Sequence, residues 1–146
     1  MLEKLQNELK AAMKERNELR TSVLRMLISD FKYAGIEKRG TLDEGESIQV
    51  VKRAIKKRKE SIELYEKGGR PELAAKETEE LKILQEFAPA ELNEATARQR
   101  IEEVIHELGA TEKRDLGRVM KEVLSRYKGQ LDGKLVQKIV SEKLGG

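Results

Sequence analysis

The chain has 146 residues, enough for one domain or two small ones, and 39% of them are charged while only 3% are aromatic. With no cysteine and a single histidine, it cannot form disulfides, thiol nucleophiles or zinc sites built from those residues, so we expect no metal site and no cofactor. The formal net charge is +3, and because no apolar run approaches the roughly 20 residues of a membrane span, we expect a cytoplasmic protein with no membrane partner.

Apolar residues recur at helical spacing from end to end, and no stretch alternates long enough to predict a strand. The sequence therefore predicts an all-α protein. Four helices are expected in residues 1–92. Their apolar stripes are Leu2, Leu5, Leu9, Ala12 and Met13; Leu19, Val23, Leu24, Leu27, Ile28 and Phe31; Ile48, Val51, Ile55, Ile62 and Tyr65; and Leu73, Leu81, Leu84 and Phe87.

Polar residues and glycines predict where these helices begin and end. Asn17 is the expected N-cap of the second helix, which should end in the glycine-bounded segment 35–40. Thr41 and Glu44 have the spacing of a capping box for the third helix. Pro71 suits the first position of the fourth.

The segment FAPAELN, residues 87–93, predicts a boundary between an N-terminal domain, residues 1–92, and a small C-terminal domain, residues 93–146. Asn93 is the expected N-cap of the first of three shorter helices. Their stripes are Ala97, Ile101, Val104, Ile105 and Leu108; Leu116, Val119, Met120, Val123, Leu124 and Tyr127; and Leu135, Val136, Ile139 and Val140.

The sequence shows no catalytic residues. His106 lies off the apolar stripe of its helix, near Glu102 and Glu103, so we expect it in solvent. The acidic cluster in KETEEL, Glu77, Glu79 and Glu80, is expected on a solvated surface beside lysines.

The basic run KRAIKKRK, residues 52–59, places most of its cations opposite the apolar stripe of the third helix. This secondary basic face comprises Lys52, Arg53, Lys56, Lys57 and Lys59. Arg58 falls near the apolar seam, where its stem would be buried and its guanidinium exposed. Glu60 and Glu63 are expected to compensate part of the charge. A solvated face and a nucleic-acid contact both remain open.

A second basic region lies in residues 113–143, which hold nine Lys or Arg against four Asp or Glu, a net charge of +5. On a continuous helix, four of these cations share an arc of about 80° that contains no acid. The four are Arg114, Arg118, Lys121 and Lys128. We call them the ridge. Gly117 is expected to keep the ridge low, and Lys134 and Lys138 add a pair on the last helix. Such a surface is typical of phosphate-backbone binding.

The stretch KGQLDGK, residues 128–134, resembles a phosphate-binding loop only superficially. A Walker loop needs four residues between its glycines, a Ser or Thr after the lysine, and a preceding strand; here three residues intervene and Leu135 follows Lys134. We expect instead a helix that ends at Gly129 in left-handed conformation, and a new helix capped by Asp132. The glycines would let the turn approach a polyanion, or serve only packing and capping.

The order RDLGRVMKEVLSRYKGQLDGKLVQKIVSEKL, residues 114–144, resembles the C-terminal tail domain of GatB, a component of aspartyl/glutamyl-tRNA amidotransferase. Together with EKGGRPELAAKETEELKILQEFAPAEL, residues 66–92, it makes the chain similar to YqeY-type proteins of the GatB/YqeY family. The resemblance implies an N-terminal helical domain joined to a tail that contacts tRNA. By association, it also implies classification as a carbon-nitrogen ligase with glutamine as amido donor.

The resulting hypothesis is a non-catalytic accessory protein that binds tRNA or another structured RNA through the C-terminal cations. A component of a glutamine-dependent amidotransferase is one alternative, although neither a kinase site nor a nucleophile is visible in the sequence. The other is a helical adaptor that docks on an amidotransferase or an aminoacyl-tRNA synthetase.

Overall fold

The computed structural model describes residues 1–145, and their regular structure is entirely helical, which confirms the all-α prediction. The elements are α1 (Leu2–Lys14), α2 (Glu18–Lys38), α3 (Glu44–Lys67), α4 (Pro71–Gln85), α5 (Glu94–Leu108), a 3-10 turn η1 (Lys113–Asp115), α6 (Leu116–Arg126) and α7 (Gly133–Lys143). Contacts divide the chain into unit 1, Met1–Ala88, and unit 2, from Pro89 onward. Across the described residues, no helix has both the length and the apolarity needed to cross a membrane.

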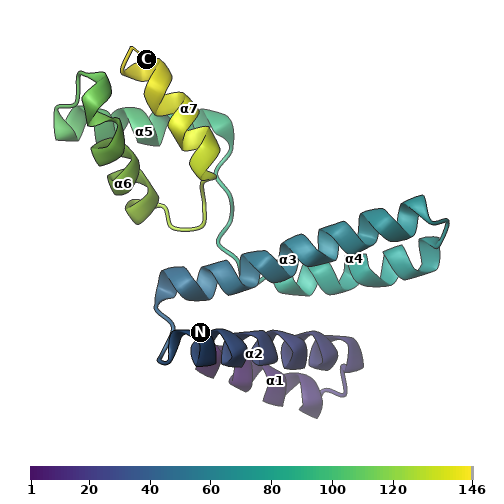
Figure 1. The fold of residues 1–146 in the computed structure, drawn as a ribbon. Coiled ribbons are helices and arrows are strands. Elements are labelled where there is room, and N and C mark those ends of the chain that lie inside the picture. Colours follow the sequence, from purple (N-terminus) through teal and green to yellow (C-terminus); the bar gives the residue numbers. More distant parts are fainter. Residues whose placement is uncertain (146) are drawn as a thin grey trace. The chain divides into compact units, whose positions relative to one another are not determined.

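Unit 1 consists of two helical hairpins, α1 with α2 and α3 with α4 (Figure 1). Its core is built mainly from the stripe of α2, on which Leu24 and Leu27 are fully buried. Leu5 of α1, Val51 of α3 and Leu84 of α4 reach the same core from the other helices. Each helix therefore turns most of its predicted stripe to the core, which is the main source of stability for a unit of this size. Met13, predicted on the stripe of α1, is instead 50% exposed.

The predicted helix starts are mostly confirmed. The side chains of Asn17 and Asn93 cap α2 and α5 by accepting hydrogen bonds from the backbone N–H three residues further on, at 3.1 and 2.8 Å. Asp132 caps α7 by accepting from the Lys134 N–H at 3.3 Å. Pro71 is the first residue of α4, where a missing N–H costs nothing.

At the α2–α3 connection one prediction is wrong and the other is confirmed. The capping box of α3 is formed by Asp43 and Glu46, not by Thr41 and Glu44. A carboxylate at the N-cap is favoured over a hydroxyl because it also interacts with the positive end of the helix dipole. The helix α2 ends at Lys38, inside the predicted segment 35–40, since Arg39 adopts the left-handed conformation that closes the helix.

Unit 2 packs α5, α6 and α7 around a second core, in which Ile101, Val119 and Ile139 are fully buried. The turn between α6 and α7 is anchored to the beginning of the unit. The Leu92 N–H donates to the carbonyl oxygen of Gln130 at 3.0 Å, and the Gln130 side-chain amide donates to the carbonyl oxygen of Ala90 at 3.2 Å. Buried Leu131 holds the same turn from inside. This fixed turn carries part of the candidate site.

Candidate nucleic-acid interface

The ridge does not lie on one continuous helix. Arg114 belongs to η1, and α6 runs only from Leu116 to Arg126, so Lys128 lies beyond its C-terminal end. Asp115 explains the break at the start, because its carboxylate accepts hydrogen bonds from the N–H groups of Thr111 and Glu112, both at 3.2 Å. These bonds offer the backbone an alternative to an α-helical turn. The predicted 80° arc therefore holds only for Arg118 and Lys121.

Two of the four ridge cations are paired with acids, which corrects the prediction of a ridge without carboxylates. Arg118 lies 3.2 Å from Asp115, and Arg114 forms an ion pair with Glu112. Both guanidinium groups stay exposed, and pairs of this kind contribute at most about 1 kcal/mol. A phosphate can thus compete for either arginine, at the cost of an existing partner.

Three lysines between the middle of α6 and the start of α7 stay unpaired. Lys121 on α6, Lys128 in the turn and Lys134 in the first turn of α7 are exposed, and none of them forms an ion pair with any residue from 1 to 145. Lys113 on η1 has the same properties and was missed from the sequence, because it precedes the expected helix. We call Lys121, Lys128 and Lys134 the lysine cluster.

Lys138 is exposed but has an acid nearby. The pKa of Glu142 lies below its usual value, chiefly because Arg98 hydrogen-bonds to its carboxylate, with smaller contributions from the charges of Arg98, Lys138 and Lys143. Part of the positive field of Lys138 is therefore used within unit 2.

The two candidate glycines differ. Gly129 has φ +74°, the predicted left-handed conformation, which other residues adopt only with strain, so the turn depends on it. The helix before it does not end at Gly129 as predicted, because α6 already ends at Arg126. A Cβ at Gly117 would meet nothing within 4 Å, so packing does not require glycine there. Gly117 is exposed and has no side chain, so it adds no bulk to the surface beside Arg118.

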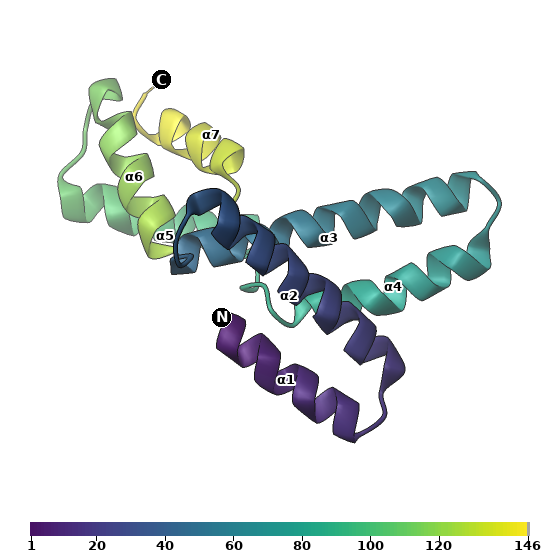
Figure 2. The ribbon, with the colours of Figure 1, turned by 60° about the horizontal axis from the view of Figure 1, so that its bottom comes forward.

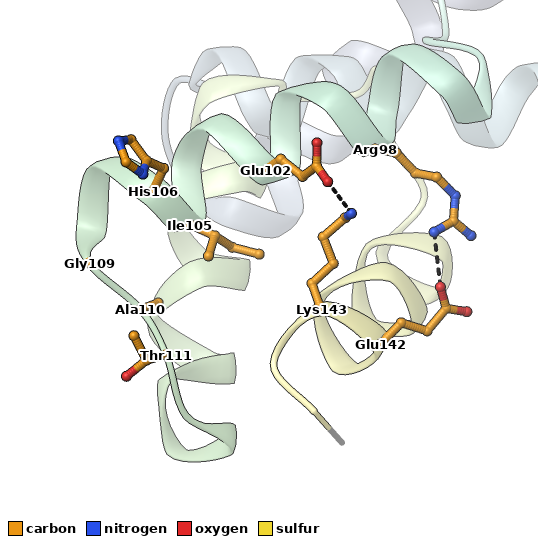
Figure 3. A pocket seen from close by; sticks show the side chains of 9 residues that line it. All are labelled: Arg98, Glu102, Ile105, His106, Gly109, Ala110, Thr111, Glu142 and Lys143. Carbon is orange, nitrogen blue, oxygen red and sulfur yellow. Dashed lines mark hydrogen bonds and ion pairs between the residues drawn. The ribbon is translucent and has the colours of Figure 1, made fainter.

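A depression of about 570 Å³ lies between α5 and α7 on unit 2 (Figure 3). Two ion pairs cross it, Arg98 with Glu142 at 2.9 Å and Lys143 with Glu102. His106 is exposed at its edge, which confirms the expected position in solvent. Each ion pair joins a residue of α5 to a residue of α7, so the two pairs hold these helices together. Both acids of the depression are therefore already engaged with cations.

The basic face of α3 keeps its charge unpaired. The five cations predicted to form it, Lys52, Arg53, Lys56, Lys57 and Lys59, make no ion pairs within the described part of the chain, and only Lys52 is half-buried. The expected compensation by acids is absent, since Glu63 pairs with Lys67 at 2.8 Å and Glu60 forms no pair with Lys56.

Arg58 is held inside unit 1 by two acids of α4. It lies 2.6 Å from Glu77 and also pairs with Glu80, and 14% of its side chain is exposed. Glu80 is only 8% exposed, so the prediction of a solvated KETEEL cluster is wrong for this residue. The guanidinium that was expected to reach solvent instead remains between α3 and α4, because the two carboxylates offset its desolvation.

No group of three or more His, Asp or Glu side chains in residues 1–145 is placed to hold a metal ion.

Residues 2–144 match the profile of a family described as Yqey-like protein. The chain belongs to the Yqey-like family. This assignment confirms the resemblance found in residues 66–92 and 114–144.

The chain is similar to proteins of several yeasts. Uncharacterized protein C22F3.15 of Schizosaccharomyces pombe is 32% identical over 85 residues, which cover 58% of this chain and 69% of that protein. Altered inheritance of mitochondria protein 41, mitochondrial, is 34% identical over 84 residues in Vanderwaltozyma polyspora and 34% over 87 residues in Kluyveromyces lactis. Those matches cover 57% and 59% of this chain but 45% and 47% of the relatives, so the shared region spans about half of the mitochondrial proteins.

Proposed function

We propose that this chain is a non-catalytic accessory protein that binds tRNA or another structured RNA, related to the tRNA-dependent amidotransferase by its C-terminal unit. The observation that supports this function best is the lysine cluster, in which Lys121 on α6 and Lys128 and Lys134 beside the anchored α6–α7 turn are exposed and unpaired. Lysine ammonium groups on a fixed backbone suit the phosphates of a nucleic acid, because the interaction needs charge and position but no base recognition.

In this role unit 1 is an N-terminal four-helix domain and unit 2 is a three-helix tail domain that carries the RNA contact. Any glutamine-dependent amide transfer would then belong to a partner such as an amidotransferase, and this chain would position the RNA. We propose a cytoplasmic location, which cell fractionation tests against the mitochondrial location in the names of two relatives.

Salt-dependent binding of labelled tRNA to the full chain tests the proposal. The logarithm of affinity should fall linearly with the logarithm of salt concentration, and the variant Lys121→Gln, Lys128→Gln, Lys134→Gln should lower the slope by about three. The control variant Lys10→Gln, Lys14→Gln, Lys76→Gln removes the same charge from exposed, unpaired lysines of unit 1. A flat salt response, or equal loss in both variants, would exclude the lysine cluster as the RNA site.

A helical adaptor is the second candidate, favoured by two exposed apolar side chains in unit 1. Ile36 on α2 is 72% exposed and Leu64 on α3 is 69% exposed. Docking through such residues would depend little on salt and would be weakened by Ile36→Ser or Leu64→Ser. Pull-down of an amidotransferase or an aminoacyl-tRNA synthetase at low and high salt distinguishes this function from RNA binding.

A further inference from the structure

A groove of about 220 Å³ lies between α2 and α3 in unit 1. The two helices contact each other there, and the course of each can be followed in Figure 2. Both helices line it with residues at i, i+3, i+4 and i+7, which places one face of each helix along the groove for two turns. Its floor is small and apolar, formed by Ala34, Val50 and Ala54. The groove is smaller than the roughly 300–1,000 Å³ of pockets that enclose a whole ligand, so it suits a single ring.

Tyr33 stands at the edge of this groove with its ring in solvent. It is 68% exposed, whereas Phe31, two residues earlier, is 3% exposed. Two residues correspond to about 200° around a helix, so α2 directs one ring into the core and the other away from it. The chain has only five aromatic residues, all of them described, and Tyr33 is the one among them that is exposed rather than buried or half-buried.

The walls of the groove carry opposite charges that do not meet. Asp30 and Glu37 flank Tyr33 on α2, and Arg53 and Lys57 face the groove from α3. None of the four forms an ion pair with any described residue, although pairs form elsewhere in unit 1, for example between Lys38 and Glu46. The groove thus presents a free aromatic face, two free cations and two free acceptors within two helical turns.

We propose that this groove binds an unpaired nucleotide of RNA, with its base stacked on Tyr33 and its phosphates at Arg53 and Lys57. Asp30 and Glu37 accept hydrogen bonds from the amino groups that adenine, guanine or cytosine carry. This inference rests on the proposed function in taking RNA as the ligand, and it adds a second site that reads single-stranded RNA. Sequence-tolerant stacking combined with cationic side chains is how such segments are commonly bound.

The nucleotide fits the groove better than an acidic peptide does. The carboxylate of an acidic peptide would be attracted by Arg53 and Lys57 as a phosphate is, but the peptide would leave the Tyr33 ring without a stacking partner. A base pair within a duplex hides both faces of its bases in the stack. An unpaired nucleotide supplies a ring, an anion and hydrogen-bond donors together, which matches the three kinds of side chain present.

A tryptophan reporter tests the site in the full chain. Because the sequence contains no tryptophan, Tyr33→Trp introduces a single fluorophore that retains a stacking face. A single-stranded adenine-rich RNA oligonucleotide should quench its fluorescence, and an RNA duplex should not. In Leu64→Trp, an equally exposed position about 10 Å further along α3 than Lys57, the same oligonucleotide should leave the fluorescence unchanged.

Two further variants test the roles of the side chains. Tyr33→Ala should weaken binding of the oligonucleotide at least about fivefold, while Tyr33→Phe retains it. Combined with the Tyr33→Trp reporter, Arg53→Gln and Lys57→Gln should abolish the quenching at physiological salt, whereas the three substitutions of the lysine cluster should preserve it.

The outcomes separate this inference from the proposed function. If the Tyr33→Trp reporter is not quenched while tRNA still binds through the lysine cluster, the groove site is excluded and the proposed function stands. If poly-glutamate quenches the reporter as strongly as RNA does, the groove takes an acidic protein segment and the inference is wrong. If the chain binds neither tRNA nor the oligonucleotide, both proposals are excluded.

Discussion

The two basic regions of the molecule differ in how much of their charge remains unpaired. In residues 113–143, four of nine cations form ion pairs within unit 2. These are Arg114, Arg118, Arg126 and Lys143. In residues 52–59 only Arg58, the one cation off the basic face, is paired. The region that looks richer in charge along the sequence therefore loses more of it to its own acids.

The burial of the pairs also differs. Arg58 and Glu80 are largely withdrawn from water, whereas the partners of Arg114 and Arg118 remain in reach of solvent. A buried pair fixes helices to each other and is costly to break, while an exposed pair mainly tunes the local potential.

Removing one acid of the buried cluster should destabilise unit 1. Glu80→Ala leaves Arg58 with Glu77 alone, and we expect the free energy of unfolding to fall by about 3 kcal/mol, the lower end of the range for broken buried pairs. Glu79→Ala is the matched control, since its exposed partner Lys82 lies 3.0 Å away, and it should cost less than about 0.5 kcal/mol. Urea unfolding followed by circular dichroism measures the free energy of unfolding of both variants. Equal losses in the two variants would show that the buried pair contributes no more than the exposed pair.

Releasing a paired arginine of the ridge should strengthen RNA binding. Glu112→Gln removes the negative partner of Arg114 and retains an amide oxygen for the turn of η1. One additional net positive charge at the surface should raise tRNA affinity about fivefold near physiological salt. Glu3→Gln on α1 changes the net charge equally and serves as the control. If both variants bind alike, only overall charge matters and the local contrast is lost.

The smallest effect concerns pH. The pKa of Asp115 is lowered, chiefly by hydrogen bonds from the N–H groups of Thr111 and Glu112, and that of Glu142 is lowered chiefly by Arg98. A lowered pKa in the folded state contributes stability above the unfolded value, which is about 4 for such groups, and this contribution disappears as the pH falls through the folded value.

We therefore expect unit 2 to lose a small amount of stability below about pH 4. Asp115→Asn should make thermal unfolding less dependent on pH in this range, and Asp132→Asn, at a residue that caps α7, is the comparison. An acid transition identical in Asp115→Asn and the parent chain would show that this carboxylate contributes nothing.

The sequence predicts the fold well because helical periodicity and capping are local properties. The N-caps Asn17, Asn93 and Asp132 and the core stripes follow from spacing alone. The error at Thr41 arose because two overlapping pairs have the spacing of a capping box, and spacing alone does not express the preference for a carboxylate that favours Asp43.

The candidate sites are less predictable because charge pairing depends on tertiary neighbours and on small breaks in helices. Asp115 ends the ridge helix early through backbone hydrogen bonds that no periodicity reveals. Glu80 is buried because α4 packs on α3 beside Arg58. Tyr33 could have been noticed, since an aromatic residue far from the apolar stripe of its own helix is a local signal.

The hydrogen bond between the Leu92 N–H and the Gln130 carbonyl oxygen has a mechanical consequence. It ties the segment of chain that enters unit 2 to the peptide segment shortly after Lys128, far along the sequence. A force applied to Leu92 must either break this bond or shift the cationic loop with it. The segment that enters unit 2 is thus a tether: a pulling force on Leu92 would be transmitted through this bond to the loop that carries Lys128, one of the cations proposed to bind RNA.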